Sequence, residues 1–382
     1  MSARLVTLET VPDLVDALAS ATRIAVDTEF HAERRYIPKL FLVQIYVPGG
    51  EAWIVDPLTP DLLESLSESL RAVSWIVHGG SQDIRLLGRA LGGMPEEVLD
   101  TQIGAGLLSE RFPEGYGTLV QRFLGRTLPK ASTLSDWSKR PLSAQQLQYA
   151  VDDVLRLPEL WASIERQLAE RGRQDIAKQA CADAREKALR ESPPEDAWRR
   201  FAAAEGMPPR ARSVLQEITS WREALAQERN QPVRTLLGDG SIVELSKRPP
   251  NTKDGILANR RFPRSAQKHV SAIWEAVERG LQRSEQDAPP CPERYSAPWR
   301  ALQVMRAWAV QLGHELGVSP RLVLNDDLLA ALALDAPTSR DEVAARLGPW
   351  RDALVGDAAW EWFHGSQRLG MHGSQVILGP TH

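Results

Sequence analysis

The chain has 382 residues, of which 43% are hydrophobic and 25% are charged, and its formal net charge is −4. This composition excludes a disordered chain, and the length allows two or three domains of ordinary size. The negative balance excludes a positive field over the whole surface, so a nucleic-acid partner requires a local basic patch.

Cysteine usage and hydropathy indicate the compartment. Cys181 and Cys291 are too few and too far apart for a disulfide framework or a zinc cluster, and they are typical of thiols in a reducing compartment. The first residues lack the apolar core of a signal peptide, and no stretch approaches the apolar length of a membrane span. We therefore expect a cytoplasmic protein without a membrane segment.

Strand-like and helix-like segments alternate in the first part of the chain. Residues 40–47 and 52–56 are apolar and separated by turn residues, which predicts a β-hairpin. Residues 62–73 have the apolar spacing of a helix. Ser81 follows another strand-like run and is a good N-cap for a helix over 82–91. This order of segments predicts an α/β domain with a mixed sheet.

The remainder of the chain has a helical pattern. A helix begins after Ser143 and is interrupted near Pro158. Two proline-rich linkers, residues 192–194 and 287–292, then separate two all-helical modules of similar plan. We expect the tail from about Ser366 to be poorly ordered.

Two carboxylates lie two positions apart at the end of an apolar strand. Asp27 and Glu29 therefore point to the same side of that strand. Two close carboxylates repel each other unless a cation lies between them. A metal site is one interpretation, and a turn that caps a helix is the other.

Three further residues could complete such a site. Tyr149 and Asp153 are four apart on a predicted helix and share one face. Asp83 lies in the first turn of its helix, where an acidic residue is favourable regardless of function. Each of these has an ordinary structural explanation alone, as a packed tyrosine, a rim aspartate or a residue that complements the helix dipole.

Taken in order, the acids and the tyrosine resemble the DEDD exonuclease superfamily in its Tyr-containing branch, and within it the bacterial ribonuclease D family. The resemblance covers roughly residues 1–190. It extends to residues between the motifs, namely Tyr36, Pro38, Leu40, Leu42, Gln44, Asp100, Thr101, Lys130, Asp136, Trp137, Arg140, Pro141 and Leu142.

This resemblance implies a ribonuclease H-like exonuclease domain at residues 1–190, with a mixed sheet. It implies two divalent metal ions, Mg²⁺ or Mn²⁺, and hydrolysis of RNA from single-stranded 3′ ends to nucleoside 5′-monophosphates. The natural substrates would be structured RNAs such as tRNA precursors, and the protein would act as a monomer. The implied metal ligands are Asp27, Glu29, Asp83 and Asp153, while Tyr149 would orient the attacking water.

The helical part resembles HRDC modules, which follow the nuclease in ribonuclease D. We expect one HRDC domain at residues 195–285 and a second, diverged one at residues 296–368. Basic residues dominate part of the first module, which favours a phosphate-binding surface. The candidates for nucleic-acid contact are Gln44 and Lys130 in the nuclease and Lys247, Arg248, Arg260 and Arg261 in this module.

Two other functions fit the same sequence. A DNA 3′→5′ exonuclease would use the same acids. A contact to the ribose 2′-hydroxyl is the physical feature that distinguishes an RNA substrate from a DNA substrate. A protein that binds RNA without cutting it is the second alternative, and the intact set of four acids and one tyrosine argues against it.

Overall fold

The fold is described from a computed structural model covering residues 3–128, 136–258, 262–373 and 375–380. Six strands form one mixed sheet in the order β1-β4-β3-β2-β5-β6. Strand β2 pairs antiparallel with β3 and parallel with β5, and β3 and β4 form the predicted hairpin. The strands are β1 (Ala3–Leu5), β2 (Arg23–His31), β3 (Lys39–Tyr46), β4 (Ala52–Val55), β5 (Ser74–Val77) and β6 (Val98–Asp100).

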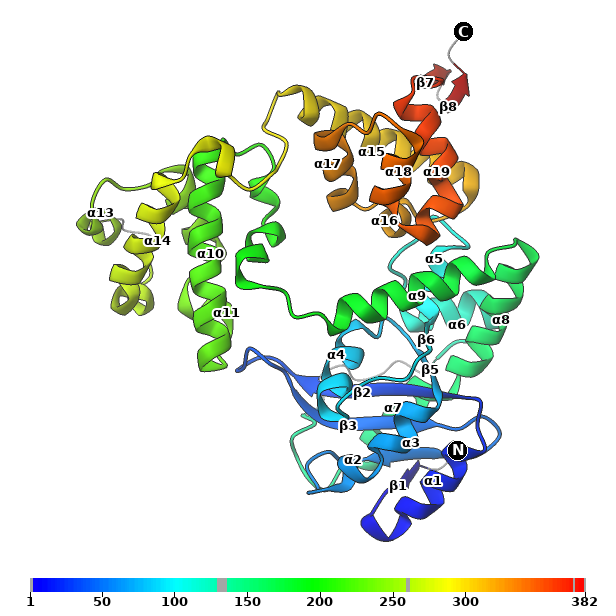
Figure 1. The fold of residues 1–382 in the computed structure, drawn as a ribbon. Helices are drawn as coiled ribbons and strands as arrows, with labels where there is room; N and C mark the ends of the chain where they lie inside the picture. Colours follow the sequence, from blue (N-terminus) through cyan, green and yellow to red (C-terminus); the bar gives the residue numbers. More distant parts are fainter. Residues whose placement is uncertain (1–2, 129–135, 259–261, 374, 381–382) are drawn as a thin grey trace.

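Helices cover this sheet and extend upward from it (Figure 1). The sequence-based expectation of an α/β domain with a mixed sheet is confirmed. The helices of this part are α1 (Val11–Ala19), α2 (Leu62–Ser65), α3 (Ser67–Ala72), α4 (Ser81–Ala90), α5 (Thr101–Gly106), α6 (Tyr116–Leu124), α7 (Ala144–Leu155), α8 (Leu157–Glu170) and α9 (Gln174–Leu189).

Two predicted helix boundaries are wrong. The helix expected over residues 62–73 is divided into α2 and α3, and the Ser65 hydroxyl donates to the carbonyl of Leu62, a local bond that competes with helix continuation. Ser81 is the first residue of α4 and Gly80 its N-cap. The start of α4 is held by a distant residue, because the Asp100 carboxylate accepts hydrogen bonds from the Gly79 and Gly80 amides at 2.9 and 3.0 Å.

The first helical module has a hydrophobic core of its own, built around α10 (Pro209–Arg229) and α14 (Val270–Gln282). These helices pack closely at Gly280, where a Cβ atom would lie 2.5 Å from the Cα of Val214. Shorter helices complete the module, namely α11 (Val233–Leu236), α12 (Asp239–Lys247) and α13 (Lys253–Ala258).

The second helical module shares a continuous hydrophobic cluster with the nuclease part, in which Trp161 and Ile164 of α8 belong with Trp308 and Leu312. Figure 1 shows this module above α5 and α9. Its helices are α15 (Ala297–Leu316), α16 (Pro320–Val323), α17 (Asp326–Asp335), α18 (Arg340–Leu347) and α19 (Pro349–Phe363).

The expectation of a poorly ordered tail is wrong for the described residues. Strands β7 (Gln367–His372) and β8 (Gln375–Pro380) form an antiparallel hairpin. The Gln367 side chain anchors it, because its amide oxygen accepts a hydrogen bond from the Trp308 indole at 3.0 Å. Among the described residues, no helix is both long enough and apolar enough to cross a bilayer.

Candidate active site

The acidic site forms where β2 extends beyond its partner β5. The parallel pairing with β5 ends at Ala25. Beyond this residue, β2 is paired along one edge, with β3, and its other edge has no strand partner among the described residues. Asp27 and Glu29 lie on this free part of the strand. Thr28, between them, is buried, and its hydroxyl donates a hydrogen bond to the carboxylate of Asp83 at the start of α4.

Helix α7 supplies the fourth acid. Ser143 caps the helix, its hydroxyl accepting from the amide of Gln146 while the Gln146 side chain accepts from the Ser143 amide. Tyr149 and Asp153 lie one turn apart, and the Tyr149 hydroxyl donates to the Asp153 carboxylate. The Tyr149 ring packs against Trp137 with 5.9 Å between ring centroids. This contact fixes the direction in which the phenol points.

Three carboxylates meet at one point. Oxygen atoms of Asp27, Glu29 and Asp153 all lie within 4.8 Å of one another. Asp83 lies outside this group of three, on the hydroxyl of Thr28, but its charge still acts on Asp27 and Glu29. The predicted acids are therefore brought together, three as a tight cluster and one beside it.

Burial and mutual repulsion make these acids hard to ionise. Burial, followed by the charges of Asp153 and Asp83, raises the pKa of Glu29 to about 8. Burial raises the pKa of Asp153 to about 7, although the hydrogen bond from Tyr149 opposes the shift. The pKa of Asp27 is also raised, by burial and then by the charge of Asp83. A divalent cation relieves this repulsion, and hard carboxylate oxygens suit Mg²⁺ and Mn²⁺.

These shifts predict that the metal-free protein loses stability as pH rises. A raised pKa means that the folded state binds the proton more tightly than the unfolded chain. For Glu29 the destabilisation is absent below its ordinary pKa of 4.5, grows with pH and is complete above about 8. In EDTA, we expect the Tm of the wild type to fall as the pH is raised from about 5 to about 9, the range over which these groups ionise. The Tm of Glu29→Gln should fall less over the same range. Equal slopes for the two proteins would contradict this expectation.

The candidate nucleic-acid contacts are distributed differently. Gln44 is paired with Asp27 in the sheet, is fully buried, and has no hydrogen-bond partner for either side-chain amide atom among the described residues. The contact between Gln44 and the bound strand stays a prediction, and α7 packs over β3, the strand that carries this residue. Lys247 and Arg248 are exposed at the end of α12 in the first helical module. Lys130, Arg260 and Arg261 lie outside the described residues.

Two residues of the site were missed. Thr28 gives no signal, because a threonine in a strand is ordinary. Tyr116, at the start of α6, accepts a hydrogen bond from the Arg156 amide at 3.2 Å. Burial raises its pKa, and the charges of Asp153 and Asp27, which act on its hydroxyl, raise it further. Only the tertiary fold reveals that position.

Comparisons with known proteins agree with this geometry. Residues 5–169 match the family model for a 3′-5′ exonuclease, and residues 211–277 match that of the HRDC domain. Ribonuclease D of Xanthomonas oryzae pv. oryzae is 33% identical over 352 residues, which cover 90% of this chain and 94% of the relative. The chain belongs to the ribonuclease D family. Ribonuclease D of Nitrobacter hamburgensis is 30% identical, with 94% of each chain covered.

The ribonuclease D fold extends over almost the whole chain. The crystal structure of Escherichia coli RNase D, described as an exoribonuclease involved in structured RNA processing, matches with a TM-score of 0.77 at 24% identity. The match covers 95% of this chain and 99% of that one. A protein from Bifidobacterium adolescentis matches with a TM-score of 0.64, over 94% of this chain and 96% of its own. These likenesses establish a shared fold that includes both helical modules.

Proposed function

We propose that this ribonuclease D family member, a 3′→5′ exoribonuclease, hydrolyses RNA with the cluster of Asp27, Glu29 and Asp153 together with Asp83. The convergence of three carboxylates within 4.8 Å carries this proposal. All four acids are present, which argues against an RNA-binding protein without activity. The products would be nucleoside 5′-monophosphates.

We further propose that the four acids hold two divalent ions, Mg²⁺ or Mn²⁺. When bound, such ions supply an activated water and neutralise the departing oxygen. Tyr149 would orient that water. Burial and the charge of Asp153 raise the pKa of Tyr149, so its phenol keeps its proton at neutral pH and acts as a hydrogen-bond donor.

The substrates we propose are structured RNAs with single-stranded 3′ ends, such as tRNA precursors. Lys247 and Arg248, in the segment matching the HRDC model, are exposed and available to phosphates. The helical domains would span residues 195–285 and 296–368, as expected above. Cys181 and Cys291 are unpaired, which supports a reducing compartment, and we propose that the protein acts in the cytoplasm as a monomer.

Digestion of 5′-labelled single-stranded RNA and DNA of one sequence tests this function. We expect Mg²⁺-dependent, stepwise shortening of the RNA from its 3′ end, abolished by EDTA and by Asp27→Ala. Equal or faster cleavage of the DNA would assign the protein to DNA instead. Retention of uncut RNA on a filter, with no cleavage of either strand, would leave a binding protein only.

A further inference from the structure

A cleft of about 640 Å³ lies between the nuclease part and the first helical module. One wall consists of the loop between β2 and β3 and one face of α4. The other consists of α10 and α11, and the segment that follows α9 closes the cleft between them. Nothing in the acidic cluster itself contributes to this lining, so the cleft is a separate feature.

The lining of the cleft is strongly basic. Six arginines face it against two glutamates, whereas the whole chain has a small negative balance. The arginines come from four segments that are far apart in sequence. They are Arg35, Arg85, Arg89, Arg190, Arg200 and Arg234.

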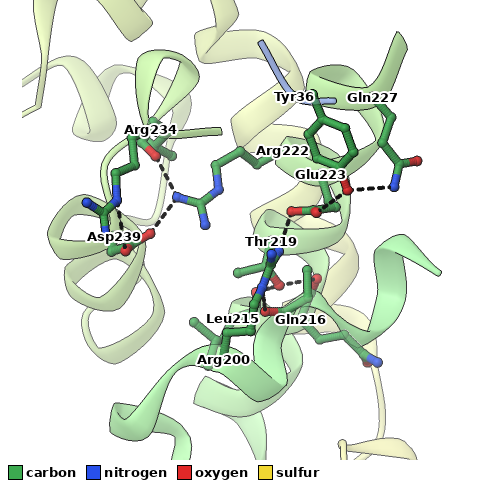
Figure 2. Close-up of polar contacts among 12 residues, drawn as sticks. Tyr36, Arg200, Leu215, Gln216, Thr219, Arg222, Glu223, Gln227, Arg234 and Asp239 are labelled. Atoms are coloured by element: carbon green, nitrogen blue, oxygen red, sulfur yellow. Dashed lines mark hydrogen bonds and ion pairs between the residues drawn. The ribbon is translucent and has the colours of Figure 1, made fainter. Parts of the chain in front are cut away.

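Much of this positive charge is not neutralised by the protein. Arg35 is exposed and has no side-chain ion pair among the described residues. Arg85 donates a hydrogen bond to the carbonyl oxygen of Ala188 at 3.1 Å. A carbonyl oxygen carries no full charge, so it does not neutralise the guanidinium. The Arg234 guanidinium is 3.9 Å from the Asp239 carboxylate (Figure 2). That carboxylate is bound more closely by the buried guanidinium of Arg222, at 2.7 Å. Arg89 pairs with an exposed glutamate that an incoming phosphate can replace.

The two walls are held together by a buried carboxylate. Glu223 of α10 is 3% exposed and accepts a hydrogen bond from the Tyr36 hydroxyl at 2.6 Å. The same carboxylate pairs with Arg200, and Gln227 donates to the Tyr36 oxygen at 3.0 Å (Figure 2). Tyr36 lies on the loop that follows β2, the strand of Asp27 and Glu29. The helical module is therefore docked on the loop that follows the strand of the acidic site.

The cleft also begins beside that site. Gln82 lines it, and the next residue in the chain is Asp83. From Gln82 to Arg89, the cleft follows α4 for seven residues, a rise of about 10 Å. That length accommodates roughly three phosphates at the spacing of a stacked strand, about 3.4 Å per phosphate.

We propose that this cleft binds the sugar–phosphate chain of the RNA upstream of the 3′ end, through Arg35, Arg89 and Arg234. The inference rests on the proposed function, because it assumes that the 3′ end lies at the acidic cluster. Apolar side chains between the arginines, Leu86 and Val233 among them, leave room for the sugars without sequence-specific contacts.

The test compares wild type with the triple variant Arg35→Gln/Arg89→Gln/Arg234→Gln. Binding of a single-stranded RNA of about 12 nucleotides is measured in EDTA, over a series of NaCl concentrations. Each lost phosphate contact flattens the plot of log affinity against log salt by about 0.7. We expect the slope to flatten by about 2 and the affinity to fall roughly tenfold or more at low salt. Hydrolysis of a trinucleotide by the wild type with Mg²⁺ tests the proposed function separately.

A matched triple variant, Arg166→Gln/Lys178→Gln/Arg321→Gln, removes the same charge from exposed positions outside the cleft. Its binding should stay close to that of the wild type. Equal effects of the two triple variants on binding would overturn the proposal. So would a salt slope that is flattened by Lys247→Gln/Arg248→Gln and unchanged by the cleft variant. Failure of the wild type to cleave the trinucleotide would count against the proposed function, while the binding data would still decide the cleft.

Discussion

Replacing Asp153 by asparagine is expected to lower kcat/KM for RNA at least about 10³-fold and to raise the Tm of the metal-free protein. Bound metal ions stabilise the transition state by several kcal/mol, and each 1.36 kcal/mol corresponds to about a tenfold rate. Loss of one charged ligand from the cluster with Asp27 and Glu29 therefore removes most of the activity.

The gain in stability has the same origin as the loss of activity. Without metal, burial and neighbouring charges raise the pKa of Asp153 to about 7 and that of Glu29 to about 8. Above these pH values both groups are ionised at an energetic cost to the fold. Asparagine keeps the size and the acceptor oxygen of the side chain and removes one charge. Natural active sites commonly sacrifice stability in this way.

Calorimetry in EDTA is carried out at about pH 8 to 9, where Asp153 and Glu29 are both largely ionised. The Tm of Asp153→Asn should then be a few degrees higher than that of the wild type. Adding Mg²⁺ should stabilise the wild type and leave the variant almost unchanged. Asp16→Asn is the matched control, because Asp16 is exposed on α1 and is not part of the cluster. A variant that is both inactive and less stable than wild type in EDTA would contradict the explanation.

Replacing Tyr149 by phenylalanine is expected to lower kcat about 10²-fold, the lower end of what a positioned proton donor or acceptor contributes. KM should change little, because the ring and its packing against Trp137 remain. The hydroxyl also lowers the pKa of Asp153 through its hydrogen bond. Its removal should therefore shift the acidic limb of the pH–rate profile to higher pH.

Single-turnover hydrolysis of a short RNA across the pH range measures both effects. Tyr46→Phe serves as the control, since Tyr46 lies on β3 and packs against the hydrophobic core. Activity of Tyr149→Phe within a few-fold of wild type, or a profile with an unshifted acidic limb, would exclude a role for the phenol in orienting water.

Residues within one element were predictable from the sequence. Asp27 and Glu29 share a side of β2 because side chains alternate along a strand. Tyr149 and Asp153 share a face of α7 because a helix repeats every 3.6 residues. These periods are properties of the backbone, so the pattern of the sequence alone determines which side chains are neighbours.

Contacts between elements required the tertiary structure. Thr28 bonds to Asp83 across 55 positions and Tyr36 to Glu223 across 187. Gln44 is buried on a strand over which α7 packs. Such pairings depend on how the faces of many helices and strands pack against one another. A short segment of sequence does not contain this information. The sequence by itself determined the acids and their local order. Only the tertiary structure decided that three of them meet, that Asp83 is held by Thr28, and that an arginine-lined cleft begins beside them.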